Sequence, residues 1–224
     1  MTKGGEDMQY LIEILPSLMS GAQMTLSIFA LTIIGAIPLG MILAVGLMRA
    51  KTWLMKGVHA LLTAYIWLFR GTPLLLQLIF VFYGLPILGI VFDRYSAALF
   101  AFILNYAAYF AEIFRGGFAA VDRGQTEASM MLNLTRWQTL RYVVIPQVVK
   151  IVLPSIGNEV INLVKDSSLV YVIGLGDLLR AGNVASARDV TLLPLVMVGV
   201  IYLVLTLVLT LGLKLLEKHF SYYR

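Results

Sequence analysis

Long stretches of uncharged, mostly apolar residues dominate this chain. No Asp, Glu, Lys or Arg occurs at the 35 positions between Glu13 and Arg49, or at the 22 positions between Arg70 and Asp93. The same holds for the 24 positions after Asp189. A helix needs about 20 apolar residues to cross the hydrocarbon core of a bilayer, so each stretch is long enough to span it. The pattern therefore predicts a membrane protein built from helices.

Five spanning helices account for these stretches. We predict one transmembrane domain over residues 1–224, with spans at about 22–48, 57–83, 95–114, 148–172 and 191–213. The fold class is thus an all-α membrane protein. Gly71 and Pro73 interrupt the second span. An alternative places 57–69 at the membrane interface and starts the crossing near Gly71, which leaves the number of crossings unchanged.

Composition agrees with this interpretation and removes several function classes. Of the 224 residues, 60% are hydrophobic and 13% are charged, against about 45–50% and ~25% in soluble domains. The chain has no cysteine and therefore no disulfide or thiolate metal site, and we expect no metal site of another kind. It also has no Walker-type phosphate loop and no Gly-rich dinucleotide turn. Energy for uphill transport has to come from an ion gradient or from another protein.

The placement of lysine and arginine predicts the orientation, because cytoplasmic loops are enriched in these residues. With the N-terminus outside and the C-terminus cytoplasmic, most of the 17 basic residues fall on the inner side. The inner residues are Arg49, Lys51, Lys56, Arg115, Arg123, Arg136, Arg141, Lys150, Lys214, Lys218 and Arg224. The outer ones are Lys3, Arg94, Lys165, Arg180 and Arg188. The net charge of +5 then anchors inner loops against anionic lipid, and we expect no nucleic-acid partner.

The longest polar segment on the inner side, residues 115–147, predicts a hairpin of two short helices. Residues 126–129 fit the first turn of the first helix, where the carboxylate of Glu127 would meet the positive end of the helix dipole. Asn133 tolerates left-handed geometry and can end that helix. Thr135 can cap a second helix that runs to Val144, and the following proline, residue 146, would end it.

This hairpin resembles the EAA motif of binding-protein-dependent ABC importer permeases. The motif is Glu-Ala-Ala, a glycine four residues after the second alanine, and a later pair of an apolar residue and proline. Here these places are held by Glu127-Ala128-Ser129, Asn133 and Ile145-Pro146. The sequence departs from the motif at Ser129 and Asn133. Serine is small enough to keep a close approach, and asparagine keeps the left-handed turn at some steric cost.

Four stretches resemble the permeases for polar amino acids within that family, and together with the hairpin they cover nearly the whole chain. They are FRGTPLLLQL at Phe69–Leu78, NYAAYFAEIFRGG at Asn105–Gly117, DRGQTEA at Asp122–Ala128 and LVKDSSLVYVIGLGDLLR at Leu163–Arg180. The resemblance implies a type I importer fold in which the short helix docks into a groove of an ATPase subunit. The ATPase-coupling residues it implies are Glu127, Ala128, Ser129, Asn133 and Leu134.

The fourth predicted span carries a polar stripe. At 100° per residue, its five strongly polar side chains fall within an arc of about 120°, and Val160, Ile161, Leu163 and Val164 occupy the other side. These polar residues are Asn158, Glu159, Asn162, Lys165 and Asp166. Such a stripe is expected to face a cavity or a partner and has complements for both charges of a free amino acid. The alternatives are an internal pairing of the lysine, amides that join helices, or an outer mouth already in water.

Three further residues are candidates for the substrate pathway. Arg70 and Thr72 flank the interruption of the second span, where unwound backbone has to line a cavity or be buried in protein. Arg70 could bind a carboxylate bidentately or reach the inner interface. Asn105 and Glu112 share one face of the third span. We expect Asn105 to line the pathway and Glu112 to pair with Arg115.

Five spans are too few to enclose a pathway, so we expect a dimer with an identical or a sister permease. The resemblance implies two ATP-binding cassette ATPase subunits, which would bind ATP and Mg, and an extracytoplasmic substrate-binding protein. It also implies a place in the cytoplasmic membrane. The chain itself is expected to be no enzyme and to hold no cofactor. The outer segment 176–189 should form a short helix that contacts the receptor or only connects two spans.

The expected function is translocation of a polar amino acid by an ATP-driven importer. One alternative is a permease of the same family for another small zwitterion, such as a betaine or an opine. Two others are an ion-coupled secondary transporter, which would not need the hairpin, and a receptor-like or assembly protein of the membrane.

Overall fold

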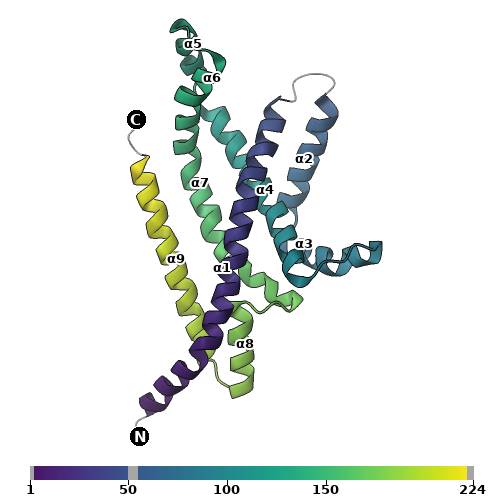
Figure 1. The fold of residues 1–224 in the computed structure, drawn as a ribbon, viewed down its shortest axis with the longest axis vertical. Helices are drawn as coiled ribbons and strands as arrows, with labels where there is room; N and C mark the ends of the chain where they lie inside the picture. Colours follow the sequence, from purple (N-terminus) through teal and green to yellow (C-terminus); the bar gives the residue numbers. More distant parts are fainter. Residues whose placement is uncertain (1–2, 50–54, 221–224) are drawn as a thin grey trace. The chain divides into compact units, whose positions relative to one another are not determined.

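The described chain is almost entirely helical. The computed structural model describes residues 3–49 and 55–220, and this part contains no β-strand (Figure 1). Lys51 and Arg224, two of the predicted inner basic residues, lie outside the described residues. The predicted all-α fold class is confirmed.

Four long helices dominate the chain: α1 (Lys3–Arg49), α4 (Arg94–Ala120), α7 (Ile145–Asp166) and α9 (Leu193–His219). With the helical residues that adjoin α7, they are long and apolar enough to cross a membrane, at Gln9–Met48, Arg94–Ala120, Arg136–Ile173 and Leu193–His219. A fifth span results if α2 (Lys56–Gly71) and the helical residues Leu74–Leu88 count as one broken span. The protein is therefore a multi-pass membrane protein.

The interruption predicted in the second span is present. Helix α2 ends at Gly71, and α3 (Leu74–Ile79) begins after Pro73, whose backbone is extended at φ −62° and ψ 136°. A proline N-terminal to a helix costs no hydrogen bond there, whereas inside a helix it removes one and clashes with the preceding turn. A π-helical turn, η2 (Phe80–Gly84), and a 3₁₀ turn, η3 (Leu85–Leu88), continue the chain after α3.

Short helical elements connect the long ones. Helices α5 (Arg123–Met131) and α6 (Arg136–Thr139) lie between α4 and α7, and the π-helical turn η4 (Leu140–Val144) joins α6 to α7. After α7 the chain continues as the 3₁₀ helix η5 (Ser167–Ile173) and then as α8 (Leu178–Asp189). Helix α8 confirms the short helix predicted for the outer segment.

The described chain divides into two compact units. The first comprises the described parts of Met1–Ile33, Pro73–Phe102 and Ile161–Leu209, and the second those of Ile34–Thr72, Ile103–Val160 and Thr210–Arg224. Helices α1, α4, α7 and α9 each contribute residues to both units. In the first unit the N-terminal half of α1 packs against α8 and the start of α9, through Ile14, Leu18, Ala22, Leu178 and Val198.

Small residues allow α1 and α4 to approach closely in the second unit. A methyl group added to Gly40 would lie 2.6 Å from Cβ of Phe110 and 3.0 Å from the carbonyl oxygen of Ala107. Ala36 and Ala44, one turn of α1 to either side, are fully buried. Interfaces between membrane helices are commonly built from small residues at this spacing, because they let backbones come close enough for van der Waals contact.

Candidate functional site

The helical hairpin of the coupling segment has a well-defined C-terminal turn. Asn133 has a φ of 56°, in the left-handed region. Its N–H donates to the carbonyl of Met130 at 2.9 Å, and the N–H of Leu134 donates to that of Ser129 at 3.0 Å. These two bonds form the Schellman motif that ends many helices. The prediction that Asn133 ends the first helix with left-handed geometry is confirmed.

The start of the hairpin differs from the prediction. Helix α5 begins at Arg123, three residues earlier than predicted, and Asp122 is its N-cap, with a carboxylate that accepts from the N–H of Gly124 at 2.6 Å. Asp is a better N-cap than the residues before Thr126, because its oxygen satisfies an otherwise unbonded N–H. Glu127 consequently lies in the second turn, so its predicted first-turn position is wrong.

The second helix starts as predicted and ends differently. Thr135 and Gln138 form a capping box, in which each side chain bonds the other residue's backbone N–H, so the predicted cap is confirmed. The prediction that Pro146 ends this helix is wrong. The π-helical turn η4 leads directly into α7, and the proline lies in the first turn of α7. The widened turn, with the N–H of Ile145 bonded to the carbonyl of Leu140, makes room for a proline ring that a regular α-helical turn would exclude.

Most of the predicted coupling residues lie on the surface of the chain. Glu127, Ala128 and Asn133 are exposed and Leu134 is half-buried, whereas Ser129 is buried and donates its hydroxyl to the carbonyl of Gln125 at 2.7 Å. Five large apolar side chains of the same hairpin are also exposed, and the most exposed is Met131, at 84%. The others are Met130, Leu132, Trp137 and Tyr142. We call these five residues the hairpin apolar surface. Sequence reasoning missed it, although its Met-Met-Leu run follows the motif directly.

The predicted polar stripe lies on α7, which is continuous over all five residues. Within the chain Asn158, Asn162 and Lys165 are exposed, and Glu159 and Asp166 are half-buried. The apolar side of the same helix is buried at Val160, Leu163 and Val164. Helix α7 thus turns its apolar side into the chain and leaves its polar side accessible. The role of the stripe in translocation stays a prediction.

Arg70 belongs to a charged cluster of the second unit. Glu112 accepts hydrogen bonds from Nε of Arg115 at 3.0 Å and from its Nη2 at 2.7 Å, which confirms the predicted pair. Nη1 of Arg70 lies 3.9 Å from the same carboxylate, and its guanidinium lies 5.4 Å from the ring centre of Tyr109. Arg70 is therefore held at α4 by an ion pair and an aromatic ring, and its side chain remains 43% exposed.

Thr72 and Asn105 contact the backbone of α2. The hydroxyl of Thr72 donates to the carbonyl of Leu68 at 2.8 Å. Asn105 is buried, and its amide donates to the carbonyl of Phe69 at 3.0 Å. Both bonds satisfy carbonyl groups that the end of a helix leaves without an intrahelical partner. The structure thus gives these residues a role in the C-terminal turn of α2, and a role in the pathway stays a prediction.

Helix α8 is fixed at both ends by a carboxylate. Asp177 is fully buried and accepts from the N–H groups of Leu179 at 3.0 Å and Arg180 at 3.2 Å. Burial raises the pKa of Asp177 to about 6. At the other end, Asp189 accepts from Nε and Nη2 of Arg188, each at 2.7 Å, and from Tyr10 at 2.7 Å. Because of these bonds, above all those from Arg188, the pKa of Asp189 falls to about 2.

The sequence was compared with protein families and with known proteins, and both comparisons find transport permeases. Residues 36–222 match the family described as "Binding-protein-dependent transport system inner membrane component". The chain is 39% identical to the arginine transport system permease protein ArtQ of Bacillus subtilis, covering 91% of this chain and 92% of that protein. It is 36% identical to the glutamine transport system permease protein GlnP of Escherichia coli K12, covering 91% and 93%.

Solved structures agree with these relatives. The chain superposes with a TM-score of 0.86 on a structure described as an amino acid ABC transporter with histidines, at 35% identity over 94% of this chain and 97% of that one. An inward-facing MetNI methionine ABC transporter shares the fold, with a TM-score of 0.68 at 18% identity. The resemblance found in the sequence is confirmed: the chain belongs to the family of binding-protein-dependent transport system inner membrane components, and it is a permease subunit of the amino-acid ABC importer type.

Proposed function

We propose that this chain translocates a polar amino acid across the cytoplasmic membrane as one of two permease subunits of an ATP-driven importer. The observation that carries the proposal is the likeness over more than nine tenths of the chain to permeases named for arginine and glutamine transport. An amino acid delivered by an extracytoplasmic binding protein would enter the pathway from outside. The orientation with the N-terminus outside is part of this proposal.

The coupling hairpin is the proposed contact with the ATPase. Exposed apolar patches on a protein commonly mark an interface, and the hairpin apolar surface lies around exposed Glu127 and Asn133. A groove on an ATPase subunit would cover these side chains, and the subunit would bind ATP and Mg, so that this chain needs no cofactor. The Schellman turn fixes the geometry with which Leu134 and Asn133 are presented.

The stripe on α7 is the proposed lining of the pathway. Glu159 and Asp166 can attract the ammonium group of the substrate, and Lys165 its carboxylate, while Asn158 and Asn162 supply uncharged hydrogen bonds. Arg70, Thr72 and Asn105 complete the candidate set. Since both charges in the stripe recognise the zwitterionic backbone of an amino acid, selection among side chains would depend on the receptor or on further contacts. A second permease chain, identical or sister, would close the pathway.

Reversing the charge of Glu127 tests the coupling contact. The Glu127→Lys variant should insert in the membrane and lose transport by at least about tenfold, since a charge of the wrong sign at an interface costs several kcal/mol and about 1.4 kcal/mol is tenfold. Glu217→Lys, the same change at an exposed residue of α9, is the matched control and should leave transport within about twofold. Normal uptake by the Glu127 variant would show that the hairpin does not couple ATP hydrolysis to transport.

Uptake of a panel of labelled amino acids tests the function as a whole. Cells that lack this chain should lose ATP-dependent uptake of one polar amino acid, and restoring the chain should recover it. Uptake that survives ATP depletion and collapses with an uncoupler would favour an ion-coupled transporter. Unchanged uptake of all amino acids together with lost uptake of a betaine or an opine would move the substrate to another zwitterion.

A further inference from the structure

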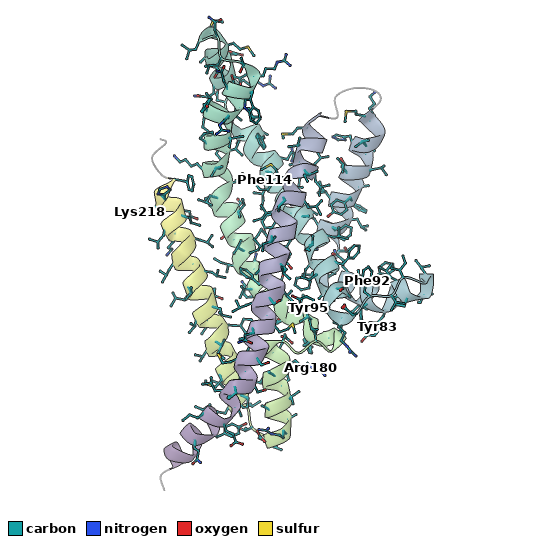
Figure 2. All side chains as sticks on the ribbon, viewed as in Figure 1. Tyr83, Phe92, Tyr95, Phe114, Arg180 and Lys218 are labelled. Carbon is teal, nitrogen blue, oxygen red and sulfur yellow. The ribbon has the colours of Figure 1, made fainter. Side chains whose placement is uncertain are left out.

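Two arginine side chains of the first unit converge on one glycine. Arg94, the first residue of α4, donates from Nε to the carbonyl of Ile173 at 2.9 Å. A methyl group added to Gly174 would lie 3.3 Å from that Nε and 3.7 Å from Nη1 of Arg180, which extends from the first turn of α8 (Figure 2). Two guanidinium groups from separate helices therefore flank the same point.

The backbone at this point keeps the space open. Gly174 ends η5 with a φ of +79°, a conformation that side chains rarely adopt. A glycine here leaves the volume in front of both guanidinium groups free of a side chain. Arg180 also lines a hollow of about 370 Å³, together with Gly176 and the hydroxyl-bearing residues Ser17 and Ser20.

Within the described part of the chain neither arginine forms an ion pair, although the carboxylate of Asp177 attracts Arg180 through space. Both side chains are exposed. The ion pairs found among the described residues involve other arginines, namely Arg70, Arg115 and Arg188. The carboxylates nearest in sequence are turned to backbone N–H groups, Asp93 to Ser96 and Asp177 to α8. Like charges brought together repel, and an anion between them removes the repulsion.

The position of the pair adds a second argument. Loops on the outer side are depleted in Lys and Arg, and in the proposed orientation both arginines lie outside. Anchoring to anionic cytoplasmic lipid cannot account for basic residues on that side. The bond to Ile173 and the ring of Phe82, 5.9 Å from the guanidinium, hold Arg94 in place, and a ligand would account for the approach of Arg180 to the same glycine.

We propose that Arg94 and Arg180 form a carboxylate-binding site at the outer end of the pathway, an inference that rests on the proposed importer function and orientation. Guanidinium groups bind carboxylates through paired, charge-assisted hydrogen bonds. The same chemistry has two sources: the α-carboxylate of the amino acid as it is handed over, and an Asp or Glu side chain of the receptor that delivers it.

The test uses the complete importer, with its ATPase, in proteoliposomes, and varies the concentration of substrate-loaded receptor. The main variant is Arg180→Gln, because among the described residues Arg180 forms no ion pair, whereas Arg94 also bonds the carbonyl of Ile173. If the receptor supplies the carboxylate, the half-saturating receptor concentration rises about tenfold at unchanged maximal uptake. If the amino acid supplies it, maximal uptake falls about tenfold, and receptor-stimulated ATP hydrolysis and the half-saturating concentration do not change.

Two further variants make the result decisive. Arg180→Lys keeps the charge but cannot bind a carboxylate bidentately, so the affected parameter, half-saturating concentration or maximal uptake, should change by an intermediate factor of about threefold. Arg188→Gln removes the same charge from the same helix, but from a guanidinium already bound to Asp189, and it should behave as wild type. If Arg180→Gln also stays within twofold of a transporting wild type, the site is overturned and the proposed function stands. A wild type without amino-acid uptake overturns both.

Discussion

Among the described residues, the two non-glycine residues with positive φ fit that conformation unequally. Asn133 has a φ of 56° and Val190 a φ of 52°. Asparagine visits this region at little cost, whereas a β-branched side chain there crowds its own backbone, at about 1–2 kcal/mol. Val190 is 91% exposed at the end of α8, so its side chain gains almost nothing from packing that would offset this strain.

Replacing Val190 with glycine should therefore stabilise the protein, by about 1 kcal/mol, because glycine adopts a positive φ without strain. Thermal unfolding of the purified importer in lipid nanodiscs measures the change as a higher Tm. The matched control is Val184→Gly in the interior of the same helix, where glycine should cost about 0.5–1 kcal/mol. A lower Tm for the Val190 variant would mean that the left-handed turn is not strained.

The buried carboxylate of Asp177 makes stability depend on pH. Its folded pKa of about 6 lies above the ordinary value of 3.8, so between these values the folded protein binds more protons than the unfolded chain. The stabilisation is fully present below about pH 4 and is lost as the pH rises through about 6, a loss of about 3 kcal/mol.

Asp177→Asn should remove this dependence, since asparagine is a good N-cap without a charge, and it keeps one of the two N–H bonds that the carboxylate accepts. The Tm of the variant should exceed that of the wild type at pH 7, and the excess should shrink toward pH 4.5. Unfolding scans of both proteins at these two pH values measure it. A Tm difference that is the same at both values would contradict the burial penalty inferred for this carboxylate.

Single residues could be predicted from the sequence where their role is local. Asn133 and Thr135 act within one turn of their own helices, so residue type and spacing were sufficient to predict them. The approach of Arg94 and Arg180 to Gly174 joins helices far apart in the sequence, and no periodicity encodes it. The early start of α5 was missed for another reason: the carboxylate of Asp122, which caps it, lies before a stretch with little helical periodicity.

At the scale of helices, the packing of α1 on α4 depends on the absence of large side chains from the interface. Gly40, between buried Ala36 and Ala44, meets the backbone of α4 at a distance that excludes even a methyl group. Membrane helices gain no hydrophobic stabilisation from leaving lipid for one another, so close van der Waals contact has to hold them together.

Gly40→Leu should consequently separate α1 from α4 and destabilise the protein by at least about 1–3 kcal/mol, the usual cost of overpacking. The expected result is a lower Tm and a smaller yield of monodisperse protein on size-exclusion chromatography. Gly212→Leu is the control and should leave both unchanged, because a methyl group added at this position of α9 would meet no neighbouring element within 4 Å. Equal behaviour of the two variants would contradict the close helix crossing.

For the molecule as a whole, the length of α1 exceeds the thickness of a bilayer. Its 47 residues extend about 70 Å at 1.5 Å per residue, against a hydrocarbon core of about 30 Å. The sequence predicted a span only at residues 22–48, although the uncharged stretch begins at residue 14 and the helix is apolar enough to cross a membrane over Gln9–Met48. The earlier turns are helical because Ile14 and Leu18 pack on Leu178 of α8, a contact that hydropathy does not encode.

The absence of native cysteine allows the proposed orientation to be tested without background labelling. A Ser17→Cys variant should react with a membrane-impermeant maleimide on intact spheroplasts, because exposed Ser17 would lie outside. An Arg123→Cys variant, at the start of α5, should react only after lysis. The opposite accessibility of the two sites would reverse the orientation, and with it the assignment of α8 to the receptor side.

The direct passage from α6 through η4 into α7 has a mechanical consequence. With no loop in between, residues 136–166 form a continuous helical stretch, so a rotation of the hairpin would act directly on α7. Beyond the widened turn that accommodates Pro146, the next weak point is Pro154 inside α7, since its missing N–H removes one bond of the helix. A rotation of the hairpin, caused by the ATPase contact, would therefore be expected to bend the helix at Pro154. Because Pro154 lies four residues before Asn158, that bend would change the direction in which the polar stripe faces.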